Sequence, residues 1–128
     1  MSIPYSDSID LLTGTSPAES SAGVTVDTTG NWIDVSKRQQ IVVQFRVSNH
    51  TSGNTVFSID GSNDGTNATT GLACQDLTAT ASTTFVTSKT ISSNATAAVK
   101  VPAGWRFIRA VSDVTTDGTS FAYMEAGG

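Results

Sequence analysis

The feature that most constrains the fold of this chain is the alternation of single apolar and polar residues in short segments. In the clearest segment, residues 40–48, Val43, Phe45 and Val47 are each separated by one polar residue. Because successive side chains of a strand point to opposite faces, this pattern predicts a strand with one buried and one solvated face. No stretch places apolar residues at helical spacing over several turns. The alternation therefore predicts an all-β protein.

Segments of this kind recur along the chain and are bounded by Gly, Asn, Asp and Ser. About eight short strands with turn residues between them are typical of a two-sheet sandwich or a small barrel. We predict an antiparallel two-sheet β-sandwich, jelly-roll-like, over residues 23–128, with an immunoglobulin-like sandwich and a small barrel as alternatives. The predicted strands are residues 23–27, 31–35, 40–48, 55–60, 73–78, 83–91, 97–101, 105–112 and 120–125.

Two of these segments carry more specific expectations. Residues 49–54 are rich in turn formers, so we expect the flanking segments 40–48 and 55–60 to form a hairpin. Farther along the chain, Phe85 and with it Val86 are expected to face the core, since large apolar side chains in strands are mostly buried.

The N-terminal residues differ in character from the rest of the chain. They contain prolines, a Ser/Thr-rich run and one apolar cluster, Ile9–Leu12. We predict an extended N-terminal arm over residues 1–22 that docks on a partner. A first edge strand of the same domain is the alternative. The predicted partner contacts are Tyr5, Ile9, Leu11 and Leu12.

Composition limits the classes of function. Lys and Arg total 7 against 11 Asp and Glu, and the net charge is −4. Nucleic-acid binding needs clustered basic residues, so no nucleic-acid partner is expected. Ser and Thr make up more than a quarter of the chain, which suits the solvated faces of sheets. The sequence shows neither a membrane span nor a secretory signal, so we expect no membrane partner and a product that stays in the cytoplasm or leaves it without a cleaved signal.

The residues that could support catalysis are few. A hydrolytic triad needs a histidine base, and the one histidine, His50, lies in a turn-like segment. The one cysteine, Cys74, lies in a different predicted segment, a strand, and we interpret it as a small buried thiol. Most aspartates fall at turns, where Asp is a turn former. We therefore predict that the protein is not an enzyme and has no catalytic residues.

The turn Asp60–Gly65 resembles the start of a calcium-binding loop. Residues with side-chain oxygens occupy its first, third and fifth positions, and glycine occupies the sixth. The pattern fails at the twelfth position, where Gly71 stands in place of a bidentate glutamate. We predict a tight turn here, with no metal and no cofactor.

Aromatic side chains allow a second class of function, since Trp32, Trp105, Tyr5 and Tyr123 could form a platform for sugar rings. Aromatic residues in strands are more often part of the core, and Trp105 has apolar neighbours. Exposure of Trp32 separates the two interpretations, because a sugar platform requires an accessible ring.

Two segments together are similar to small structural proteins of tailed bacteriophages. Residues 56–67 form a strand followed by a Gly-Ser-x-Asp-Gly-x-Asn turn. Residues 102–111 contain Gly-Trp-Arg-Phe-Ile-Arg, and a later turn at Asp117–Gly118 precedes a closing strand. The resemblance covers residues 41–125. This chain has Ala68 shortly after the first motif, where the family has a bulky aromatic residue.

This resemblance implies a virion component built as a β-sandwich. We expect a capsid decoration (cement) protein on the capsid surface, made in the host cytoplasm. It would bind the major capsid protein and assemble as a homotrimer. The alternative is a carbohydrate- or receptor-binding sandwich of a phage tail or fibre.

Overall fold

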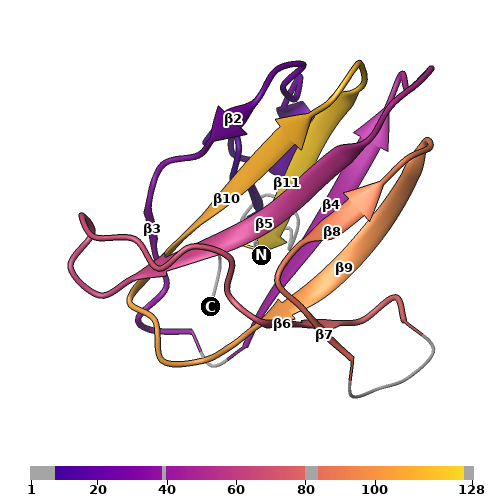
Figure 1. Cartoon of the computed structure of the whole chain (residues 1–128). Coiled ribbons are helices and arrows are strands. Elements are labelled where there is room, and N and C mark those ends of the chain that lie inside the picture. The colour runs from indigo at the N-terminus through magenta and orange to yellow at the C-terminus, as the bar shows by residue number, and fades with distance from the viewer. Residues whose placement is uncertain (1–7, 39, 80–83, 126–128) are drawn as a thin grey trace, which may run out of the picture.

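The computed structural model describes residues 8–38, 40–79 and 84–125. Two antiparallel sheets pack face to face, as Figure 1 shows. The first sheet has six strands in the order β1 (Ser8–Asp10), β11 (Thr119–Glu125), β4 (Ile41–Ser48), β9 (Ala95–Val101), β6 (Cys74–Asp76) and β7 (Phe85–Val86). The second sheet has the order β2 (Thr28–Thr29), β10 (Phe107–Val114), β5 (Thr55–Ser62) and β8 (Lys89–Ile91), and β3 (Ile33–Asp34) also pairs with β10. One short 3-10 helix, η2 (Ala18–Ser20), follows β1.

The strand order is that of a jelly roll. From β4 onward the long strands alternate between sheets, with β4, β9 and β11 in the first sheet and β5 and β10 in the second. The first four strands of one sheet, β1-β11-β4-β9, thus face β2/β3-β10-β5-β8 in the other. This double-sheet arrangement defines the jelly roll. The predicted all-β, antiparallel two-sheet sandwich is confirmed, and β6 and β7 extend the first sheet beyond β9.

The hairpin predicted from residues 40–48 and 55–60 is wrong. The strands β4 and β5 lie in different sheets, β4 between β11 and β9, and β5 between β10 and β8. Their connection contains two residues of positive φ, Asn49 and Gly53, and carries the chain across the gap between the sheets. A sequence rich in turn formers is compatible with either geometry, because it specifies a reversal and not the sheet that receives the next strand.

A second crossover, from β10 to β11, lies beside the first. The Asp117 carboxylate accepts hydrogen bonds from the backbone N–H groups of Thr51 (3.0 Å) and Ser52 (3.1 Å) and from the Thr51 hydroxyl. These bonds hold the pKa of Asp117 at about 2, with the Thr51 hydroxyl as the largest cause. The two crossovers are therefore fastened to each other at one end of the sandwich.

Alternation in the long strands produces the core. Val43, Phe45 and Val47 of β4 are buried, as the sequence predicts. The Phe45 ring stacks on the Phe57 ring of the other sheet, with ring centroids 4.6 Å apart and planes 13° from parallel. Burying side chains of this size contributes about 1.5–3 kcal/mol each, so this contact joins the two sheets firmly.

The apolar cluster near the N-terminus belongs to this core. In β1, Ile9 pairs with Met124 of β11, and it packs against the buried cluster. Leu11 and Leu12 are 1% and 5% exposed. The backbone N–H of Leu11 donates to the carbonyl of Ala122 over 2.7 Å. Within this segment Ser8–Asp10 forms an edge strand of the sheet, which is the alternative to an extended arm, and Leu11 and Leu12 follow it in a turn.

Candidate binding surface

One side of the six-stranded sheet faces away from the core, and we call it the outer face. The register of β4 with β9 and β11, and of β6 with β9 and β7, places its residues in cross-strand rows. Leu77 joins it through its backbone N–H, which donates to the Ala98 carbonyl. The outer face comprises Val42, Gln44, Arg46, Gln75, Leu77, Phe85, Thr96, Ala98, Lys100, Phe121, Tyr123 and Glu125.

Large apolar side chains are exposed on this face. Val42 is 44%, Leu77 44% and Phe85 63% exposed. Among the residues that the structure describes, one further large apolar side chain is exposed, Val26 at 66%, which precedes β2. Apolar groups gathered on one face of a folded domain mark an interaction surface more often than scattered ones do.

The register shows how these groups are spaced. Val42 pairs with Lys100, which pairs with Gln75, which in turn pairs with Phe85. With strands about 4.8 Å apart, this row spans roughly 14 Å from Val42 to Phe85. The outer face is thus a band of apolar groups with polar side chains between them.

An aromatic cluster bounds the outer face on β11. The guanidinium carbon of Arg46 lies 4.9 Å from the centroid of the Phe121 ring, and Arg46 donates to the Tyr123 hydroxyl over 3.3 Å. The Phe121 and Tyr123 ring centroids are 5.5 Å apart. A depression of about 250 Å³ adjoins Arg46. Ligand pockets usually measure about 300–1,000 Å³, so this depression suits one side chain of a partner better than a whole small molecule.

The outward side of the five-stranded sheet, the opposite face, is built differently. Arg109 Nε donates to Asp60 Oδ2 over 3.0 Å, and the other oxygen of Asp60 accepts the Gly71 N–H over 3.2 Å. The guanidinium carbon of Arg109 lies 4.3 Å from the centroid of the Trp32 ring. Asp60 is buried, whereas Trp32 is half-buried. The charges at the centre of this face are therefore paired within the chain.

The turn that resembles a calcium loop is organised by Asp64. Its carboxylate accepts hydrogen bonds from the backbone N–H and side-chain amide of Asn67, the Thr66 N–H and the Ser62 hydroxyl. These bonds, led by the Asn67 N–H, hold the pKa of Asp64 well below its usual range. Both carboxylates of the motif, that of Asp60 included, thus bind donors of the protein itself. Within the described ranges, no group of three or more His, Cys, Asp or Glu residues is placed to hold a metal ion.

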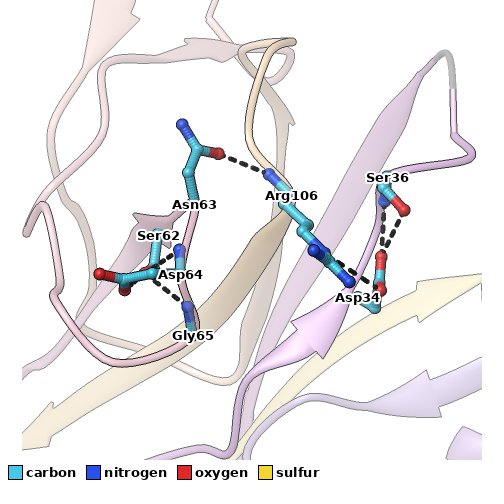
Figure 2. A network of polar contacts seen from close by, with 7 residues as sticks. All are labelled: Asp34, Ser36, Ser62, Asn63, Asp64, Gly65 and Arg106. Atoms are coloured by element: carbon cyan, nitrogen blue, oxygen red, sulfur yellow. Dashed lines mark hydrogen bonds and ion pairs between the residues drawn. The ribbon is translucent and has the colours of Figure 1, made fainter.

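Figure 2 shows how this turn is joined to neighbouring segments. Asn63 Oδ1 accepts the backbone N–H of Arg106 over 2.9 Å, and Arg106 Nε lies 3.7 Å from Asp34 Oδ2. The Asp34 carboxylate accepts both the hydroxyl and the N–H of Ser36, and these two bonds are the main causes that lower its pKa. The network fixes loops that lie along the opposite face.

The two residues weighed as nucleophile and base lie apart. Cys74 is buried, as predicted, and burial raises the pKa of its thiol to about 11. It lies near the level of Ile41, at the start of β4, whereas His50 follows the end of that strand. The His50 ring contacts the Gly53 carbonyl at 2.7 Å. A protonated thiol and a distant imidazole do not form a nucleophile–base pair.

In the structure, the predicted partner contacts that it describes are not exposed side chains. Tyr5 lies outside the described residues. Ile9 is half-buried, and Leu11 and Leu12 are core residues that a partner could not reach without unfolding the edge strand. Deleting residues 1–14 would remove both leucines, so a loss of binding in that truncation would report on folding.

The alternation of apolar and polar residues does not predict the outer face, although the sequence carries one signal of it. In the run Ile41–Val43, the middle residue Val42 is apolar at a position whose neighbours along the strand, such as Gln44, face solvent. An apolar residue on the polar side of an alternating strand indicates a contact surface. The prediction for Phe85 is wrong, since this side chain is exposed while Val86 packs against the core.

The comparisons with known proteins leave the chain unassigned. No protein-family model matches it, and no curated protein or solved structure was found that matches it. Among the described residues, no helix has the length and apolar character needed to cross a membrane.

Proposed function

We propose that this chain is a structural protein of a virus particle that binds the surface of the major capsid protein lattice, as a decoration protein does. It acts by binding and not by catalysis, and its docking surface is the outer face. The proposal joins the resemblance of residues 56–67 and 102–111 to phage structural proteins with the exposed apolar groups of one sheet.

The observation that carries the proposal is the location of these groups. Val42 of β4, Leu77 just after β6 and Phe85 of β7 lie on one face of the same sheet, and each is at least 44% exposed. Burial of large apolar side chains against a partner is the main favourable term in protein association. Many copies on a lattice gain occupancy through repeated small contacts, so one chain needs no deep pocket.

The test replaces apolar groups at one corner of the outer face, with Leu77→Ser and Phe85→Ser in one variant. The matched control is Val26→Ser, because Val26 is at least as exposed but lies elsewhere. We expect the double variant to lose most of its occupancy on expanded phage capsids in a co-sedimentation assay, and the control to bind as the unmodified protein does. Equal occupancy of the double variant would refute the outer face as the docking surface.

A second candidate function is carbohydrate binding by the opposite face. The half-buried Trp32 ring leaves part of its surface accessible, and Arg109 and Asp60 fix its orientation. Accessible indole rings bind sugars by stacking, with polar groups beside them giving orientation. Signal on a glycan array that disappears in Trp32→Ala favours this function, and an array without signal removes it.

A further inference from the structure

We propose that two copies of the chain pair through the centre of the outer face about a two-fold axis that passes by Val42. The inference rests on the proposed function only in using the same face. It names the first occupant of that face as a second copy of this chain.

The short edge strands of the two sheets favour association of two copies through their faces. The edge strands β1 and β8 have three residues each, and β2 and β7 have two each. Short edge strands offer few free backbone groups and so disfavour edge-to-edge pairing. The strands of the outer face that could meet a partner broadside, β4, β9 and β11, have seven or eight residues.

Two side chains of opposite charge on the outer face lie on either side of Val42. Lys100 pairs with Val42 on one side. On the other side Met124 pairs with Val43, and continuing this register places Glu125 beside Val42. The two charges therefore flank Val42 at about 5 Å each, one strand away on either side.

A two-fold axis parallel to the strands exchanges these two positions. A second copy rotated by 180° about that axis presents its Glu125 to Lys100 and its Lys100 to Glu125. The pairing forms two ion pairs around a contact between the two Val42 side chains. No ion pair among the described residues includes either Lys100 or Glu125.

The next row of the outer face is complementary in size. Tyr123, Gln44 and Ala98 occupy consecutive strands. The same rotation sets the large Tyr123 of one copy against the small Ala98 of the other, and Gln44 against Gln44. Large side chains opposite small ones allow two sheets to interdigitate at about 10 Å separation.

The axis also passes near Arg46, so the positively charged Arg46 side chains of the two copies would face each other. Each guanidinium is instead drawn sideways onto the Phe121 ring and toward the Tyr123 hydroxyl, away from the axis. Phe85 of β7 lies three strands from the axis, one strand beyond the partner's edge strand β1, so it stays available for the capsid, whereas Leu77 faces that edge strand.

The experiment is a charge exchange measured by sedimentation equilibrium on the full chain. We expect a dimer whose Kd rises at least about tenfold in Lys100→Glu and in Glu125→Lys, since each change sets like charges against each other twice. The double variant, carrying both changes, restores the Kd to within about threefold of the original. The control Lys37→Glu makes the same charge change at an exposed turn and leaves the Kd unchanged.

Several results would overturn the dimer. A monomer at every concentration, or the trimer expected from the family resemblance, contradicts it. Single exchanges without effect, or a double variant that remains as weak as the singles, also contradict it. Capsid occupancy of the same variants is a separate measurement, so capsid binding without dimers refutes this inference alone, and dimers without capsid binding refute the proposed function alone.

Discussion

The two outward faces of this sandwich differ in whether their side chains are paired within the chain or exposed to solvent. On the opposite face, Asp60 is buried against Arg109, which stacks on Trp32, and the turn around Asp64 is saturated with internal hydrogen bonds. On the outer face, Val42 and Phe85 are left exposed to solvent. One face thus pairs its charged groups within the fold, and the other leaves apolar side chains exposed.

The largest effect is expected from the ion pair of the opposite face. Asp60→Asn leaves Arg109, whose side chain is 24% exposed, without its carboxylate. Removing one partner of a buried ion pair destabilises a protein by about 3–5 kcal/mol, and the partial exposure of Arg109 favours about 3 kcal/mol. Urea unfolding of both proteins measures the difference. A decrease in the free energy of unfolding below about 1 kcal/mol would mean that the ion pair stabilises the fold no more than an exposed pair does, and the difference between the faces would then fail.

A smaller effect concerns the joint between the sheets. Lys89 of β8 donates to Asp76 of β6 over 2.7 Å, and this bond is the main cause that lowers the pKa of Asp76 from 3.8 to about 2. Because the folded pKa is depressed, the stabilisation is complete above the unfolded pKa and is lost as the pH falls from about 4 through 2. A shift of this size corresponds to about 2 kcal/mol.

The measurement compares urea unfolding at pH 6 and pH 2.5 in the unmodified protein and in Asp76→Asn. The variant should show a smaller acid-induced loss than the unmodified protein, by on the order of 1–2 kcal/mol. Other carboxylates, that of Asp117 included, contribute equally to both proteins. Identical pH dependence in the two proteins would show that the pair does not join the sheets energetically.

The smallest effect is expected on the outer face. Because Leu77 and Phe85 are exposed, Leu77→Ser with Phe85→Ser should change the free energy of unfolding by no more than about 0.5 kcal/mol per site. The midpoint in urea checks this. A loss of several kcal/mol would show that these side chains support the fold, and the comparison between the faces would then fail.

The sequence predicts the jelly roll better than it predicts the surface. Strict alternation in β4 identifies Val43, Phe45 and Val47 as core, because a shift by one residue would expose all three. The strands β6 and β7 have three and two residues, too few for a period to show, so the sequence does not predict the outward direction of Phe85. The sequence predicts Asp60 only as a turn residue, because its partner Arg109 lies far along the chain. Pairings of this kind depend on which strands become neighbours, which local pattern does not encode.

The pairing of β1 with β11 has a mechanical consequence. Ser8 lies directly opposite Glu125, so the outermost described residues of the chain sit side by side at one end of an antiparallel pair. A force that separates these two points would open the ladder one hydrogen bond at a time, which resists weakly. A load spread over the broad side of the sheet would instead act on all strands together. The domain should therefore resist a load on the broad side of its sheets far better than a force that pulls Ser8 and Glu125 apart.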